Sequence, residues 1–348
     1  MIGTAKRIGA TLFALWLTCA GMTAFAEQPV LTSLSEILAY VDENQPMELD
    51  LGSVRLRPGD LYTIRQHMPE KAILHFTTRW QEMTISDTDS ELDLRSLPYR
   101  ITGSELEQLI VLLPNVRKID VTGRYYPSNK EMIPVVDSHP EIEFVWIIRL
   151  NTGHALCSTD TAYSSFNDPT NQSLVRMTSK DLEVLRYAPG LKALDLGHNS
   201  ITDLDFLQYF PDLELLILGE NPIEDIEILG TLTHLKYLEL FSVQISDVSP
   251  LANCTELLDL NLSYCKKVTD LSVLSGLNAM ERFWGAHMDG LSEDQKEQFI
   301  LSYPQTDVKF NAIHATSDGW REHERYDHYI WCLKNHTWIS FDQPLPAD

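Results

Sequence analysis

The feature that most constrains this chain of 348 residues is a motif that recurs every 22 residues. Its copies begin at Leu191, Leu213, Leu235 and Leu257, and the last copy has one extra residue. Leucines occupy the same places in every copy, and in three copies a polar residue follows them, at Asn199, Asn221 and Cys265. No single copy can bury its leucines alone, so the copies are expected to stack on one another.

The pattern L-x-x-L-x-L-x-x-N/C at a fixed period is the signature of a leucine-rich repeat solenoid. Each L-x-L segment predicts a short strand whose leucines point inward while the residue between them points to the opposite face. The asparagine side chain can satisfy backbone groups of the following turn. Val243 interrupts this series, so its copy must satisfy the turn differently. We therefore predict an α/β solenoid, a right-handed superhelix with a parallel concave sheet.

Longer, irregular strand–helix units are predicted before the regular copies. Amphipathic segments that precede x-Pro turns predict helices at 58–67, 103–112, 128–137 and 179–187. Two polar stretches, 77–91 and 151–174, are interpreted as loops inserted at one edge of the solenoid.

Both ends of the solenoid are expected to carry caps, because terminal repeats need polar covers. A helix at 31–44 should cap the first end, and the other should be closed by a helix at 291–302, a strand at 308–310 and the aromatic, histidine-rich segment 312–342. The chain is thus divided into a targeting segment, an N-terminal cap with irregular repeats, an inserted loop and helix, the regular repeats and a C-terminal cap. Their ranges are 1–26, 27–150, 151–187, 188–290 and 291–348.

The first 26 residues have the pattern of a signal peptide. Lys6 and Arg7 precede an apolar stretch at 8–18, and Ala24-Phe25-Ala26 offers a cleavage site before Glu27. The apolar stretch is too short to span a bilayer comfortably. We predict a secreted or surface-exposed protein without membrane insertion after cleavage; lipid attachment at Cys19 is the less favoured alternative, because a small residue does not precede that cysteine.

The charge balance is strongly acidic. The sequence holds 50 Asp and Glu against 27 Lys and Arg, a net charge of −23, and loss of the two basic residues of the signal peptide makes this about −25. Nucleic acids and anionic membranes are polyanions, so both are unfavourable partners. We expect a soluble monomer.

Four cysteines remain after the signal peptide, with no zinc or disulfide-rich spacing. Cys254 and Cys265 fall at inward positions of the repeat and are interpreted as small buried side chains. A disulfide between Cys157 and Cys332 is left open.

The phrase Ile245-Ser246-Asp247-Val248-Ser249-Pro250-Leu251 closely resembles the internalin type of leucine-rich repeat, and Thr202-Asp203-Leu204 and Thr269-Asp270-Leu271 match part of it. The resemblance is specific for residues 188–279. It implies a bacterial, secreted or surface-exposed binding protein.

Residues between the strand leucines are predicted to project from the concave face. An apolar patch is expected there, formed by Leu215, Ile217, Tyr237 and Phe241. Charged side chains should surround it, at Asp195, Glu239, Asp259 and Arg282. Trp146 and Trp284 occupy the equivalent middle position of their strands. Such a composition is typical of protein interfaces, and aromatic side chains often dominate them. We predict a protein partner at this patch. The alternative is that loop 77–91 or 151–174 folds over the patch and buries it.

Two other functions are kept as alternatives. A carbohydrate-binding protein would use Trp146, Trp284 and the terminal aromatics against sugar rings. A metal-dependent hydrolase would use His314, His323, His328 and His336, although their spacing is loose. The loop that holds His154, Cys157 and Ser165 lacks a G-x-S-x-G or His-Glu-x-x-His motif. We therefore predict a protein without catalytic residues, cofactor or metal.

Overall fold

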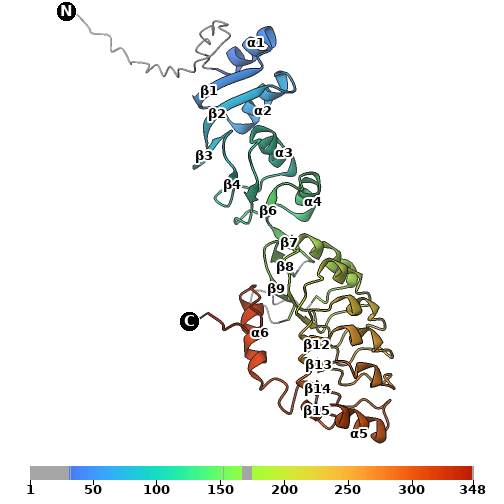
Figure 1. Ribbon diagram of the computed structural model, residues 1–348. Coiled ribbons are helices and arrows are strands. Elements are labelled where there is room, and N and C mark those ends of the chain that lie inside the picture. Colours follow the sequence, from blue (N-terminus) through green and yellow to red (C-terminus); the bar gives the residue numbers. More distant parts are fainter. Residues whose placement is uncertain (1–30, 32, 152, 167–174, 347–348) are drawn as a thin grey trace, which may run out of the picture.

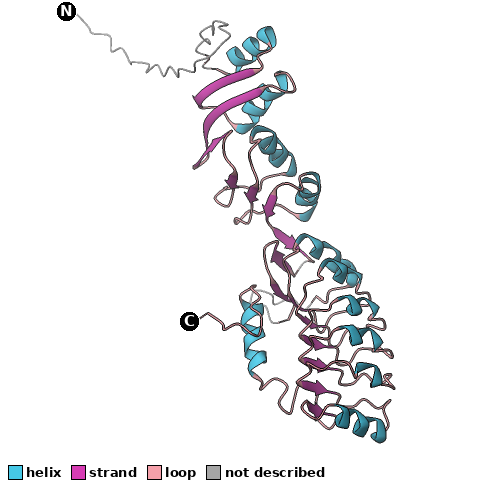
Figure 2. Ribbon diagram, in the orientation of Figure 1, coloured by secondary structure: helices cyan, strands magenta, loops and turns pink. Residues whose placement is uncertain are grey.

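The computed structural model describes residues 31, 33–151, 153–166 and 175–346. The predicted signal peptide and Cys19 lie outside the described residues. The described chain forms an elongated, curved solenoid with strands along one side and most helices along the other (Figure 1). Figure 2 shows the same separation of strands from helices along both halves.

The N-terminal half contains two three-stranded sheets, ordered β1-β2-β3 and β4-β5-β6. The strands are β1 (Glu48–Val54), β2 (Ile73–Trp80), β3 (Met83–Ser86), β4 (Glu91–Asp93), β5 (Lys118–Asp120) and β6 (Glu143–Val145). Every neighbouring pair is parallel except β2 and β3, which form an antiparallel hairpin. The prediction of a loop at 77–91 is therefore wrong. Its side chains alternate between buried and exposed, as in Thr78 and Arg79, which is the pattern of a strand.

Four α-helices cover the opposite side of these sheets: α1 (Leu34–Asn44), α2 (Pro58–His67), α3 (Gly103–Leu112) and α4 (Asn129–Ser138). The helices predicted at 58–67 and 103–112 are confirmed, and the one at 128–137 begins one residue later. The sequence sets the start of α3 through a capping box. Thr102 Oγ1 accepts from the backbone N–H of Glu105 at 3.2 Å, while the Glu105 carboxylate accepts from the N–H of Thr102 at 2.9 Å.

The regular repeats build a seven-stranded parallel sheet, ordered β15-β14-β13-β12-β11-β10-β9. Its strands are β9 (Ala162–Ser164), β10 (Ala193–Asp195), β11 (Leu215–Ile217), β12 (Tyr237–Glu239), β13 (Asp259–Asn261), β14 (Arg282–Trp284) and β15 (Asp307–Lys309). Successive strands pair in the register of one repeat, so Leu194 faces Leu216 and Leu216 faces Leu238. The antiparallel hairpin of β7 (Ile147–Arg149) and β8 (Ala155–Cys157) leads into this sheet. Strands β8 and β9 thus occupy part of the stretch 151–174 predicted as a loop, and 167–174 lies outside the described residues.

On the convex side each regular repeat makes a short 3-10 helix. These are η1 (Ser179–Tyr187), η2 (Asp205–Tyr209), η3 (Glu227–Thr231), η4 (Ser249–Asn253) and η5 (Ser272–Leu274). The helix predicted at 179–187 is present, but as a 3-10 helix. A helix α5 (Glu293–Ser302) follows the last regular repeat and confirms the helix predicted at 291–302 within two residues.

The asparagine series satisfies the turns as predicted. Asn199 accepts from the N–H of Met177 at 2.8 Å and donates to the carbonyls of Leu196 and Gly197. Asn221 repeats this arrangement one repeat later, and its amide donates to the Leu218 carbonyl at 2.9 Å.

Val243 has no side-chain amide to donate to the turn, and a residue of the next repeat donates in its place. The Cys265 thiol donates to the Leu240 carbonyl at 3.1 Å. Cys254 donates in the same way to Leu229 at 3.3 Å. Both cysteines are fully buried, which confirms their predicted place in the core, and burial raises the pKa of each thiol to about 12.

The C-terminal segment takes a course that the sequence did not predict. After β15 the chain turns back and runs along the strand side of the solenoid, and helix α6 (Glu324–Lys334) lies beside β9 and β10 (Figure 1). The Thr161 N–H donates to the His336 carbonyl at 3.1 Å, and the Trp338 N–H donates to Thr161 Oγ1 at 2.7 Å. The segment therefore covers the concave face itself, and not merely the open end of the core.

Candidate functional site

Nine of the ten predicted docking residues lie together on the strand side of the large sheet. Asp195, Leu215, Ile217, Tyr237, Glu239, Asp259, Arg282 and Trp284 belong to β10–β14, and Phe241 follows β12. The tenth, Trp146, lies between β6 and β7 and packs edge-on against Tyr187 in the main core. The alignment of the repeats therefore predicted correctly that these nine residues are neighbours.

The predicted exposure of these residues is wrong, because all ten are buried. The C-terminal segment covers Leu215, Ile217, Tyr237 and Trp284, with which it shares one hydrophobic core, and residues 77–91 contribute nothing to that core. Tyr237 shows its extent, since the ring is 0% exposed and has the rings of Trp320, Tyr329 and Phe341 at 5.5, 5.0 and 6.3 Å. Trp284 lies 5.2 Å from Trp320. These aromatic rings form a second hydrophobic core between the sheet and the segment.

Phe241 is buried for a separate reason. Its ring lies over Gly219 of the preceding repeat, where an added Cβ would come within 2.4 Å of the Phe241 ring. Only a residue without a side chain leaves room for the ring at that place.

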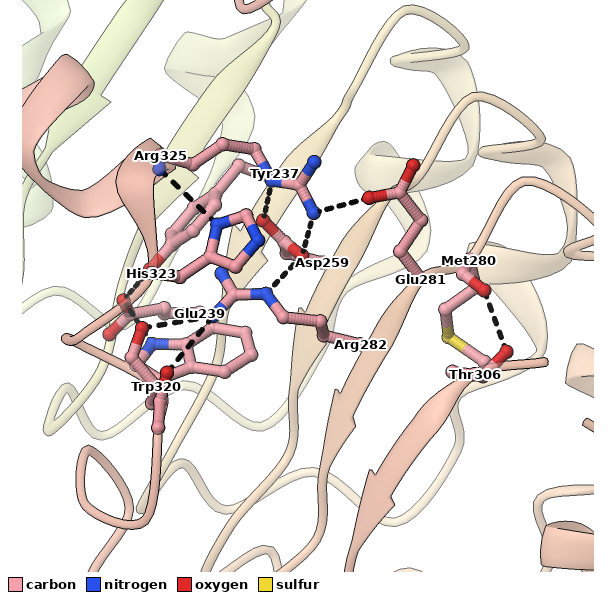
Figure 3. Close-up of polar contacts among 11 residues, drawn as sticks. Tyr237, Glu239, Asp259, Met280, Glu281, Arg282, Thr306, Trp320, His323 and Arg325 are labelled. Carbon is pink, nitrogen blue, oxygen red and sulfur yellow. Dashed lines mark hydrogen bonds and ion pairs between the residues drawn. The ribbon is translucent and has the colours of Figure 1, made fainter.

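A buried ion-pair cluster joins the sheet to the C-terminal segment (Figure 3). The Asp259 carboxylate accepts from Arg282 Nε at 2.7 Å and from Arg325 Nε and Nη2 at 2.7 and 2.9 Å. Arg325 also donates to Glu281 at 2.7 Å, and Arg282 Nη1 donates to the Trp320 carbonyl at 3.0 Å. Asp259 is fully buried. Two guanidinium groups, one from each side of the contact, therefore share one carboxylate.

Glu239 is the second buried acid at this contact. Its Oε1 accepts from the Tyr237 hydroxyl and from Trp320 Nε1, the latter at 2.8 Å. Burial raises the pKa of Glu239, and it raises the pKa of Tyr237 and Tyr329 well above the usual value. The hydrogen bond from Trp320 ties this carboxyl to the covering segment.

The strand side of the N-terminal half has no such cover among the described residues. Side chains that alternate with the buried leucines are open to solvent on β1, β2, β4 and β6, including Glu48, Asp50, Ile73, Glu91, Asp93 and Glu143. Ion pairs cross this face, with Lys118 Nζ 2.7 Å from Glu143 Oε1 and His75 Nδ1 2.9 Å from Asp87 Oδ2. The hydrogen bond to Asp87 is the main cause that raises the pKa of His75.

Of the aromatic residues proposed for sugar binding, Trp146, Trp284 and Trp320 are each at most 1% exposed, whereas Tyr326 and Trp331 are partly exposed. The C-terminal histidines contribute to local structure. His323 caps α6 by accepting from the Arg325 N–H, and His328 Nε2 donates to the Ile339 carbonyl at 2.8 Å. Within the described ranges, no group of three His, Cys, Asp or Glu is arranged to hold a metal ion.

His154 and Cys157, which were considered as candidates for catalysis, also have structural surroundings. The ring nitrogens of buried His154 lie 3.0 Å from the Val175 carbonyl and 3.3 Å from the Tyr163 hydroxyl. Cys157 and Cys332 carry free thiols, so the disulfide left open between them is absent from this structure. Across the described part of the chain, no helix combines the length and apolar character needed to cross a bilayer.

A family comparison agrees with the repeat. Residues 189–231 match the family described as Leucine Rich repeats (2 copies). An internalin (InlF) from Listeria monocytogenes is similar, with 20% identity, coverage of 57% of this chain and 48% of that chain, and a TM-score of 0.35. Internalin C2 of the same species has 19% identity, coverage of 55% and 82%, and a TM-score of 0.29.

The functional domain of InlJ, again from Listeria monocytogenes, has 13% identity, coverage of 82% of this chain and 62% of that chain, and a TM-score of 0.32. The matched region of InlF is about half of that protein's structure. No curated protein sequence matches this chain. The family match over residues 189–231 and the parallel sheet of stacked repeats show that the molecule is a leucine-rich repeat solenoid.

Proposed function

We propose that this protein is a non-enzymatic, secreted or surface-exposed binding module whose protein partner docks on the open strand face of β1, β2, β4, β5 and β6. Solenoids of stacked repeats offer extended concave surfaces for this purpose. The observation that carries the proposal is the contrast between the two halves. The outward side chains of β10–β14 are buried by the chain's own C-terminal segment, whereas those of the N-terminal strands are open.

The open face has the composition of a recognition surface. Met47 and Ile73 are 58% and 51% exposed, and their backbones are adjacent, since the Ile73 N–H donates to the Met47 carbonyl at 3.0 Å. Charged residues lie next to Ile73 in the sheet: Glu48 is its register partner, and Asp50 and His75 form the next outward pair. Apolar centres with charged rims are the usual anatomy of protein interfaces.

In this proposal, the nine concave residues predicted from the sequence bind the chain's own C-terminal segment. A partner that used Tyr237 and Trp284 would have to displace the aromatic rings of the C-terminal segment and break the Asp259 ion pairs. Breaking a buried ion pair costs about 3–5 kcal/mol. The open N-terminal face is available without that cost.

The test compares two exposed apolar sites. The double variant Met47→Arg/Ile73→Arg changes the open face, and Leu301→Arg changes an equally exposed residue of α5, 65% exposed. Proteins captured from the native extracellular surroundings by the unaltered protein are identified, purified and titrated against the three forms. We expect binding to fall at least tenfold for the double variant only.

Equal binding by all three forms would reject the open face as the docking site. Loss of binding with Leu301→Arg alone would place the interface at the other end. N-terminal sequencing of the exported protein tests the secretion step, and we expect Glu27 as the first residue.

A further inference from the structure

A cleft of about 590 Å³ lies in the N-terminal half, between the start of α2, the β2–β3 turn and α3. It is separate from the open face discussed above, since it is lined by the ends of these elements and not by the middle of the strands. Its size is within the range of small-ligand pockets, which measure roughly 300–1,000 Å³.

One wall of the cleft is aromatic. Trp80, the last residue of β2, and Tyr99 both line it, and their ring centroids lie 6.5 Å apart at 70°, in an edge-to-face pair. Both side chains are only partly buried. Burial, assisted by the charge of Glu105, raises the pKa of Tyr99, so its hydroxyl stays neutral at physiological pH and can donate a hydrogen bond.

Two arginines line the same cleft, Arg57 beside the start of α2 and Arg79 before Trp80. Both are exposed, and neither guanidinium has a carboxylate within 4.0 Å among the described residues. Arginine binds a carboxylate through two parallel hydrogen bonds, which lysine does not.

The acids of the cleft are already engaged. Glu105 Oε2 accepts from the N–H and the hydroxyl of Thr102, both at 2.9 Å, and Asp60 Oδ2 accepts from the Arg57 N–H at 3.2 Å. They hold the first turns of α3 and α2. Two positive and two negative side chains make the lining neutral in sum, so a highly charged polyanion gains little there.

Two amide side chains complete the lining. Gln81 stands in the β2–β3 turn and Gln108 on α3. Each amide offers a carbonyl acceptor and two N–H donors, the combination that pairs with neighbouring hydroxyl groups. Gln81 has a φ of 54°, in the left-handed region that favours glycine, so glycine at this position would relieve the backbone.

We propose that this cleft binds an acidic saccharide: a sugar with one carboxylate, such as a terminal uronic or sialic acid of a glycan. The carboxylate pairs with Arg57 and Arg79, the hydroxyl groups bond to Gln81 and Gln108, and an apolar face of the sugar ring packs on Trp80 and Tyr99. Neutral sugars lack the charge for the arginines, and an acidic peptide lacks the hydroxyl groups that the amides require.

The test is calorimetric titration of the full-length secreted protein with sialyl- and glucuronyl-oligosaccharides. The matched ligands are the same oligosaccharides with the carboxylate reduced to an alcohol, and a short peptide with a free carboxylate. We expect the acidic oligosaccharides to bind at least tenfold more tightly than either matched ligand, because the reduced sugars lose the charge-assisted hydrogen bonds and the peptide lacks the hydroxyl groups.

Three variants locate the binding. Arg79→Gln and Trp80→Ala should each weaken it at least tenfold. Gln81→Gly should also weaken it while raising or preserving the unfolding midpoint, because glycine suits the left-handed turn. That variant separates recognition from folding. The Met47→Arg/Ile73→Arg variant, which tests the protein-binding face, should bind the sugar unchanged.

The proposal fails if no acidic oligosaccharide binds at millimolar concentration. It also fails if the reduced sugars or the peptide bind equally well, or if Arg79→Gln and Gln81→Gly leave the affinity unaltered. Failure here leaves the protein-docking proposal intact, because the two use different residues.

Discussion

Removal of the Asp259 carboxylate is the sharpest energetic perturbation that the structure offers. The carboxylate is fully buried and is the shared acceptor of Arg282 and Arg325, with three N···O distances of 2.7–2.9 Å. In Asp259→Ala both guanidinium groups lose this partner inside the contact. Breaking a buried pair costs about 3–5 kcal/mol, chiefly because it leaves a buried charge uncompensated.

A loss of that size is a large share of the 5–15 kcal/mol that usually separates folded from unfolded domains. Urea unfolding followed by circular dichroism measures it as a lower midpoint. The matched control is Asp289→Ala, because Asp289 forms a surface pair with Lys266 in which both side chains are more than half exposed. Exposed pairs contribute little, so the control midpoint should stay almost unchanged. Equal midpoints for the two variants would refute the inference that this cluster fixes the C-terminal segment to the sheet.

Three further predictions concern the same core, His75 and the cysteines. Tyr237→Ala should destabilise the protein by about 3–5 kcal/mol, measured by urea unfolding, because the ring is buried among Trp320, Tyr329 and Phe341; an unchanged midpoint would mean that the ring is open to solvent. His75 has a raised folded pKa, chiefly through Asp87, with Glu48 and Asp50 adding to the effect, so its stabilisation is full below the unfolded pKa of about 6.5 and is lost as pH rises through the folded pKa. His75→Gln should therefore lower the unfolding midpoint more at pH 5.5 than at pH 8.5, and the opposite order would contradict the assignment. Partly exposed Cys157 should react with a maleimide before Cys254 and Cys265, whose thiol pKa values are near 12; mass spectrometry of the modified peptides reads the order, and early labelling of Cys265 would show an open core.

The regular repeats were predictable because local and tertiary requirements coincide there. Leucines at a fixed period must stack, and the stack places Leu194, Leu216 and Leu238 side by side in the register that the sequence indicates. The turn chemistry followed as well, since Asn199 and Asn221 bond the carbonyls that their positions suggest. The positions of the residues between the strand leucines were predicted correctly for the same reason.

The cover over those columns could not be read from periodicity. Residues 312–342 have no repeat, so nothing local distinguishes a segment that caps the end from one that folds back over the sheet. A signal was nevertheless present in the composition. Trp320, Tyr329 and Arg325 carry the aromatic and basic chemistry that complements the apolar patch and its acids Glu239 and Asp259.

The β2–β3 hairpin was missed because its residues are polar. Threonine and serine are frequent in loops, yet threonine also favours strands, and the alternation of Trp80, Met83 and Ile85 with polar neighbours indicates a hairpin. The Trp80–Tyr99 cleft depends on this hairpin, so it could not be predicted once the hairpin was interpreted as a loop.

Backbone hydrogen exchange in the intact protein tests most directly whether the C-terminal segment is a permanent cover of the concave sheet. We expect amides of α6 to exchange as slowly as those of β10–β13, because the segment and the sheet share one aromatic core and the Asp259 cluster. We also expect Asp259→Ala to accelerate exchange in α6 while exchange in β1 and β2 stays unchanged. Exchange of α6 within seconds in the unaltered protein, with slow exchange in the strands beneath it, would show a detached segment and contradict the account.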